Sequence, residues 1–221
     1  MGKVRVIEIH EDVFGDNNKM AEEIRKDLKE KGTFFLNVMS SPGSGKTTAL
    51  SAVINLIKDK VKVGLMDVDI ESSLDADKVS DLTGVPAIQI HNGGLCHIDA
   101  DMTKRALNEF DAKDLDVLIL ENIGNLVCPA EFDTGAHKSI MIFSVPEGDD
   151  KPLKYPLMFS VCDMVLISKI DTKDFFNFDM DAAVKNIKNL NPNATIIPIS
   201  AKTGEGMDVF AKWILDNAKA F

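Results

Sequence analysis

The sequence predicts an α/β fold, with a doubly wound, mostly parallel sheet of about seven strands flanked by helices. Two observations predict it: apolar runs of strand length recur along the 221 residues, and helix-length segments separate them. The runs are nearly continuous in apolar character rather than alternating, which is typical of strands buried on both faces of a parallel sheet. Apolar residues make up 45% of the chain, which is enough for a sizeable core.

The elements follow in chain order. A charged segment, 14–32, has the pattern of a helix that ends at Gly32. The predicted strands are 33–39, 61–68, 86–90, 115–121, 139–145, 163–169 and 194–200. The clearest predicted helices are 46–58, 99–110, 175–190 and 205–219. We therefore expect an N-terminal arm and helix over residues 1–32 and a single domain over residues 33–221.

Charge and cysteine content exclude several classes of protein. The net charge of −10 argues against unaided nucleic-acid binding, which needs a basic surface. Three well-separated cysteines do not form a secreted disulfide framework. No stretch approaches the ~18 consecutive apolar residues of a membrane span, and the N-terminus lacks the apolar core of a signal peptide. The expected location is the cytoplasm, with no nucleic-acid and no membrane partner.

A phosphate-binding loop is predicted at "SSPGSGKTT", residues 40–48. It fits the pattern G-x-x-x-x-G-K-[ST] in its last three places, whereas Ser40 stands where the first glycine is usual. The glycines let backbone N–H groups curl around a phosphate, the lysine supplies a charge and the threonine hydroxyl can bind Mg²⁺. The alternative is a Ser/Gly loop that happens to hold a lysine. The predicted nucleotide-binding residues are Gly43, Ser44, Gly45, Lys46, Thr47 and Thr48, with catalytic roles for Lys46 and Thr47.

Carboxylates at the ends of neighbouring predicted strands complete this site. Asp69 and Glu121 are placed to join Thr47 around Mg²⁺, directly or through water. Asp67, Asp75 and Asp77 are more readily explained as ordinary solvated charges or helix caps than as functional residues. Asp75 is the candidate among them for a catalytic role.

The element "VLISKID", 165–171, indicates which base is bound. Lys169 and Asp171 match the N-K-x-D element of GTPases, in which one carboxylate accepts hydrogen bonds from guanine N1–H and N2–H₂. Adenine would leave Asp171 unpaired, which is a costly mismatch. Ser168 replaces the usual asparagine and is expected to lose a contact to the base or to the phosphate loop. A second base-contacting element is predicted at Ser200, Ala201 and Lys202; its alternative is a plain strand-to-helix turn.

Cys96 and His97 stand side by side behind two glycines, and Cys128 follows Glu121 by seven residues. Two thiols and an imidazole suit Zn²⁺ or Ni²⁺, but three ligands are one short of a closed tetrahedral site. A water or a ligand from a second subunit would complete it. The alternative is two small buried thiols and a hydrogen-bonded histidine, and the residues alone leave both open. Cys162 has the surroundings of a core residue, and His137 belongs to no motif.

Several motifs in this order resemble the HypB family of GTPase accessory proteins for nickel–iron hydrogenase maturation. They are "SSPGSGKTT", "GVPAIQI", "CHIDADM", "ENIGNLVCPAEFD", "EGDDKPLKYP", "NFD" and "SAKTGEGMD". The likeness covers roughly residues 33–210, and the two longest motifs separate the chain from urease and cobalamin-enzyme accessory GTPases.

The resemblance implies a P-loop GTPase of the SIMIBI class that assists nickel insertion. It implies that GTP and Mg²⁺ draw two subunits together, and that Cys96, His97 and Cys128 bind Zn²⁺ or Ni²⁺ near their contact. The implied partners are the hydrogenase large subunit and other hydrogenase maturation proteins. The alternatives are a zinc or nickel carrier with nucleotide as a structural ligand only, an accessory GTPase for another metalloenzyme, and a small-molecule kinase.

Overall fold

The computed structural model describes residues 13–69, 74–110 and 114–221, with their side chains except at positions 13, 69 and 74–78. Seven strands form one sheet in the order β3-β2-β4-β1-β5-β6-β7, and every neighbouring pair is parallel. The strands are β1 (Phe34–Ser40), β2 (Val63–Asp69), β3 (Ala87–His91), β4 (Val117–Gly124), β5 (Lys138–Ser144), β6 (Met164–Ser168) and β7 (Thr195–Pro198). The predicted fold and all seven predicted strands are confirmed, with small shifts at their ends.

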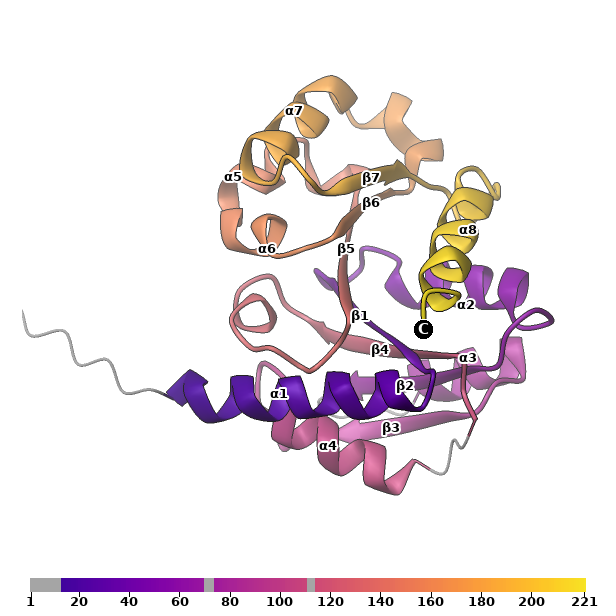
Figure 1. The fold of residues 1–221 in the computed structure, drawn as a ribbon. Helices are drawn as coiled ribbons and strands as arrows, with labels where there is room; N and C mark the ends of the chain where they lie inside the picture. The colour runs from indigo at the N-terminus through magenta and orange to yellow at the C-terminus, as the bar shows by residue number, and fades with distance from the viewer. Residues whose placement is uncertain (1–12, 70–73, 111–113) are drawn as a thin grey trace, which may run out of the picture.

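Helices connect the strands and cover both faces of the sheet (Figure 1). They are α1 (Val13–Glu30), α2 (Lys46–Ile57), α3 (Leu74–Thr83), α4 (Ala100–Glu109), α5 (Lys151–Lys154), α6 (Pro156–Ser160), α7 (Met180–Leu190) and α8 (Met207–Ala218). The expected start of the helix at 175 is wrong. Residues 170–175 form a 3₁₀ helix, η3 (Ile170–Phe175), and α7 begins after Asp179, whose side chain accepts a hydrogen bond from the Ala182 N–H.

The central strand shows how the chain divides its core between the two faces. Phe34, Leu36 and Val38 point into the cluster beneath α2 and α8, whereas Phe35 points into a second cluster under α1 and α4. Met39 belongs to a third cluster with α6 and α7. Such a strand must be apolar at almost every position, which explains the continuous apolar runs of the sequence.

Helix α1 packs on the sheet and is fastened to the segment that follows β4. Ala21, Ile24 and Leu28 are buried in the cluster it shares with α4. Arg25 donates to both carboxylate oxygens of Asp133, at 2.9 and 2.6 Å. A bidentate pair of this kind fixes both direction and distance, so α1 is held firmly against this segment.

His137 links α1 to the central strand. Its Nδ1 accepts a hydrogen bond from the Phe35 N–H at 2.9 Å, so Nε2 carries the proton and donates to the Arg25 carbonyl, also at 2.9 Å. The C-terminal Phe221 ring lies 4.3 Å from the imidazole, centroid to centroid. Burial, with the nearby charges of Arg25 and Lys29, lowers the pKa of His137 below its ordinary value of 6.5.

This pKa predicts how stability depends on pH. Above about pH 6.5 the imidazole is neutral in both states, and its contribution to stability is complete. As pH falls below that value, the unfolded state takes up a proton that the folded state resists, so stability is lost toward the lower folded-state pKa. His137→Gln should therefore reduce the loss of unfolding free energy between about pH 8 and pH 5.5, measured by urea denaturation. Equal losses in the two proteins would contradict the assignment.

None of the helices in the described part of the chain has the length and apolar character needed to cross a bilayer.

Candidate functional site

The phosphate-binding loop lies between the end of β1 and the start of α2. Gly43 and Gly45 have φ angles of 74° and 91°, a left-handed conformation that glycine adopts without steric cost. The loop lines a hollow of about 610 Å³ that also includes residues from β2, β4 and the loop after β6. The hollow's lining residues are Ser40, Ser41, Pro42, Gly43, Ser44, Gly45, Lys46, Thr47, Thr48, Asp67, Val68, Ile123, Gly124 and Lys169.

Three predicted site residues meet at the inner wall of this hollow. Thr47 Oγ1 donates to Glu121 Oε1 at 2.7 Å, and Lys46 Nζ lies 3.6 Å from the same oxygen. The ammonium also donates to the carbonyl oxygen of Asn122. Glu121 is only 1% exposed. The Glu121 carboxylate and the Thr47 hydroxyl that is hydrogen-bonded to it are hard oxygen donors of the kind that Mg²⁺ prefers.

The neighbouring strand β2 adds a second buried carboxylate. Asp67 is 2% exposed and pairs in register with Glu121 across β2 and β4. Its burial is inconsistent with an ordinary solvated charge, and it lines the hollow. The predicted magnesium ligand Asp69 ends β2, and the predicted catalytic Asp75 lies in α3, but both side chains lie outside the described residues.

The predicted base-binding elements lie together beside the phosphate loop. Lys169 has a left-handed backbone with φ 59°, and its Nζ donates to the Gly43 carbonyl at 2.6 Å. Ser200, which is fully buried, donates from Oγ to Asp171 Oδ1 at 2.8 Å. The structure thus brings the K-x-D element, the turn at Ser200, Ala201 and Lys202, and the glycine loop into one region.

Ser168 corrects one expectation. Its shorter side chain was expected to lose a contact, yet its Oγ donates to the Ser44 carbonyl at 2.6 Å while both residues are buried. The link between the strand β6 and the phosphate loop is therefore made by the hydroxyl. The expected loss of a contact is therefore wrong for the phosphate loop, whereas the loss of a contact to the base stays a prediction.

The two predicted metal-binding cysteines lie side by side at the surface. Cys96 Sγ donates to Cys128 Sγ at 2.8 Å, and this hydrogen bond is the main reason that the pKa of Cys96 is raised. Cys96 is exposed and Cys128 is half-buried, which contradicts the alternative of two buried thiols. Cys162 is buried, donates to the Met158 carbonyl, and has a pKa raised by burial, as expected for a core residue.

His97 adjoins this pair, but its ring faces Phe132. The two rings are stacked with centroids 3.7 Å apart, and His97 Nδ1 lies 3.9 Å from Cys96 Sγ. Within the described ranges, no group of three or more His, Cys, Asp or Glu side chains is gathered as a metal site. Two thiols and an imidazole suit Zn²⁺ or Ni²⁺ as donors. The structure brings two of these three predicted donors, the thiols of Cys96 and Cys128, into contact.

Glu147 is a residue of this region that the sequence analysis did not single out. Its carboxylate accepts hydrogen bonds from Ser41 of the phosphate loop and from Ser144 at the end of β5. Lys151 Nζ lies 3.2 Å from the same carboxylate. Glu147 is the first residue of the motif "EGDDKPLKYP", but its contact with Ser41 could not be predicted because the two residues are 106 positions apart.

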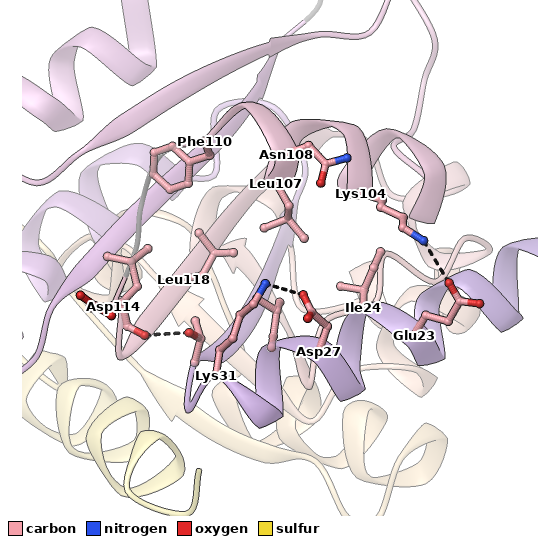
Figure 2. A pocket seen from close by; sticks show the side chains of 13 residues that line it. Glu23, Ile24, Asp27, Lys31, Lys104, Leu107, Asn108, Phe110, Asp114 and Leu118 are labelled. Carbon is pink, nitrogen blue, oxygen red and sulfur yellow. Dashed lines mark hydrogen bonds and ion pairs between the residues drawn. The ribbon is translucent and has the colours of Figure 1, made fainter.

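A larger hollow, of about 1100 Å³, lies between α1 and α4 (Figure 2). It shares no lining residue with the hollow at the phosphate loop. Leu107, Phe110 and Leu118 form part of its apolar wall, and the ion pair between Lys104 and Glu23 spans its rim (Figure 2). No predicted site residue lines it.

The chain is similar to known proteins over most of its length. Residues 34–198 match the family described as CobW/HypB/UreG, nucleotide-binding domain. The hydrogenase maturation factor HypB of Escherichia coli (strain K12) is 41% identical over 214 residues, which cover 97% of this chain and 73% of that protein. HypB from Helicobacter pylori, solved in complex with nickel, is 38% identical with a TM-score of 0.88, covering 93% and 96% of the two chains. HypB from Archaeoglobus fulgidus is 36% identical with a TM-score of 0.85, covering 92% and 98%.

Proposed function

This chain belongs to the HypB family of hydrogenase maturation factors, and from that premise we propose that it is a GTP-hydrolysing metallochaperone that assists nickel insertion into nickel–iron hydrogenase. One observation carries the proposal. Glu121, beside Lys46 and Thr47 at the phosphate loop, stands on the strand whose continuation places Cys128 against Cys96. A nucleotide and a thiolate-bound metal would therefore act on the two ends of one short segment.

The proposed reaction is attack of water on the γ-phosphate of GTP. Lys46 would neutralise charge on the β- and γ-phosphate oxygens, and the N–H groups of the loop and of the first turn of α2 would donate to the same oxygens. Thr47, Asp69 and Glu121 would hold Mg²⁺, which supplies further neutralisation of the phosphate charge when bound. Asp75 is the proposed catalytic carboxylate. Turnover should be slow without a partner, as in related P-loop GTPases.

The proposed base is guanine, read by Asp171. Its carboxylate is held by the Ser200 hydroxyl at 2.8 Å, with Lys169 and the Ser200–Lys202 turn beside it. We expect at least about a tenfold preference for GTP over ATP, because adenine would leave the carboxylate unpaired. Equal affinities for GTP and ATP in the wild type would refute this assignment.

Asp171→Asn should transfer the preference from GTP to XTP. The amide can donate to the extra carbonyl of xanthine, whereas it cannot accept both donors of guanine. The measurement is competition of GTP, XTP and ATP for one labelled nucleotide. Asp174→Asn, at an exposed position of the same short helix, is the matched control and should keep the preference for GTP.

The proposed metal is cargo rather than a resident cofactor, and Cys96, His97 and Cys128 are its proposed ligands. Three ligands leave a tetrahedral shell incomplete. We propose that GTP draws two copies of the chain together and that ligands from both complete the shell. Zn²⁺ and Ni²⁺ both suit these donors. The proposed partners are the hydrogenase large subunit and other hydrogenase maturation proteins, and residues 33–221 are proposed as the GTPase domain, preceded by the arm and helix of 1–32.

Phosphate release under multiple turnover tests this proposal against its alternatives. A GTPase releases more than one phosphate per chain at saturating GTP and Mg²⁺ with no acceptor added. A carrier with a structural nucleotide would stop at one or fewer, and a small-molecule kinase would need its acceptor. An accessory GTPase for another metalloenzyme would pass this assay, but its deletion would leave hydrogenase activity intact.

A further inference from the structure

We propose that Asn17 of α1 is a positioning residue for the metal site, because its side chain makes hydrogen bonds to both segments that bear the ligands. The inference rests on the proposed function, since it assumes that Cys96, His97 and Cys128 bind the metal. It assigns to α1 a task beyond packing, namely setting the separation of the two ligand-bearing segments.

The amide of Asn17 makes one hydrogen bond to each segment. Oδ1 accepts from the Ala100 N–H at 2.8 Å, and Nδ2 donates to the Asp133 carbonyl at 3.0 Å. Ala100 is three residues after His97 and begins α4, while Asp133 is five residues after Cys128. Both partners are backbone groups, so the bridge constrains the path of the chain rather than a flexible side chain.

Further contacts between α1 and the Cys128–Asp133 segment hold the Asn17 bridge in place. Arg25, two turns further along α1, is paired with both carboxylate oxygens of Asp133. The Phe132 ring lies between Phe14 of α1, at 5.4 Å, and His97, at 3.7 Å, centroid to centroid. The N-terminal end of α1 therefore also contacts Phe132, the residue on which the His97 imidazole is stacked.

Further along α1, its separation from α4 leaves the larger hollow between them (Figure 2). There the exposed ion pair between Lys104 and Glu23, at 3.0 Å, is the contact that joins the two helices across the rim. An exposed pair of this kind contributes little to stability. Asn17 is thus the polar contact of α1 that reaches both ligand segments, whereas removal of the Lys104–Glu23 pair should leave the position of α1 nearly unchanged.

The physical consequence is a preorganised metal site. Removing a group that holds a metal ligand in place typically lowers the metal affinity by roughly 10–100-fold. Without the bridge, the stack of His97 on Phe132 and the hydrogen bond from Asn125 to the Cys96 carbonyl still join the two segments, but their separation is less restricted. Metal binding then carries the entropic cost of fixing that separation. Asn17→Ala should therefore weaken Ni²⁺ binding by about tenfold.

The experiment is a Ni²⁺ titration of the full chain, with the metal alone as probe. Competition with a chelator gives the affinity, and the absorbance of thiolate-to-nickel charge transfer gives the number of bound thiolates. Asn18→Ala is the matched control, because Asn18 is the next residue of α1, is exposed, and makes no side-chain hydrogen bond within the described part of the chain. Affinity for GDP should stay within about twofold in both variants, since neither residue lines the phosphate hollow.

Two further variants separate positioning from general damage. Asn17→Asp keeps the acceptor for the Ala100 N–H but cannot donate to the Asp133 carbonyl. It should therefore bind Ni²⁺ as weakly as Asn17→Ala. If Asn17→Ala folds poorly, Asn17→Asp provides the same test. Lys104→Ala removes only the ion pair and should bind as tightly as the wild type. Wild-type affinity in Asn17→Asp, or equal weakening in Lys104→Ala, would overturn the inference. A wild-type protein whose thiolates bind no Ni²⁺ would instead overturn the proposed function.

Discussion

Replacing Lys46 by alanine is expected to abolish measurable GTP hydrolysis while leaving the fold intact. The ammonium stands at the inner wall of the phosphate hollow, with its side chain 13% exposed and 3.6 Å from Glu121. In such a sheltered place its charge acts on the transition state with little screening by water. Loss of one donor to a developing charge costs roughly 10²–10³-fold in turnover. Because we expect slow intrinsic turnover, this loss would place the rate below detection.

The assay is phosphate release at saturating GTP and Mg²⁺, with circular dichroism to verify the fold. Lys60→Ala is the matched control, because Lys60 is exposed just beyond the end of α2, at the opposite end from the phosphate loop. The control should retain the wild-type rate. Wild-type turnover in Lys46→Ala would show that this lysine does not act on the phosphates.

The second large effect is expected at Cys128. Cys128→Ser should lower Ni²⁺ or Zn²⁺ affinity by more than about 100-fold, since even the groups that orient a ligand are worth roughly 10–100-fold. GTP affinity of the monomer should change little. If two subunits complete one metal shell, metal must also shift the nucleotide-dependent dimerisation, by typically about 1–3 kcal/mol. This reciprocal effect should disappear in the variant.

Sedimentation of wild type and variant measures that coupling, with GDP or a GTP analogue, each with and without metal. Cys162→Ser is the matched control, because the same substitution is made at a buried thiol that donates to the Met158 carbonyl, a bond that serine can keep. It should retain metal-dependent dimerisation. A monomer–dimer balance of the wild type that metal leaves unchanged in every nucleotide state would refute the coupling.

The sheet was predictable from the sequence because its central strands are buried on both faces and are therefore apolar at most positions, although the edge strands β3 and β7 are only partly buried. The phosphate loop was predictable for a different reason: glycine positions and a lysine at fixed spacing leave a short-range pattern. Helices α5 and α6 were not expected, since they are only four and five residues long and each has a proline near its start. Periodicity cannot identify a helix of little more than one turn.

Contacts between distant residues were beyond prediction from the sequence. Asn17 and Asp133 are 116 positions apart, and Ser41 and Glu147 are 106 apart. His137 belonged to no motif because its role depends on the Phe35 N–H and the Arg25 carbonyl, which any residue type would offer. Asp67 differs from ordinary surface charges in being buried. This burial results from the pairing of β2 with β4, which the sequence does not show.

The order of the strands has a consequence for how the chain can be altered. The turns proposed to read the base follow β6 and β7 at one edge of the sheet, whereas Cys96 follows β3 at the other edge. The phosphate loop follows the central β1. On the proposed assignments, base preference and metal preference would therefore arise at opposite edges of the sheet. Strand β4 is the exception, because Glu121 lies on it and Cys128 follows it. A change there would alter the proposed Mg²⁺ site and the proposed thiolate site at once.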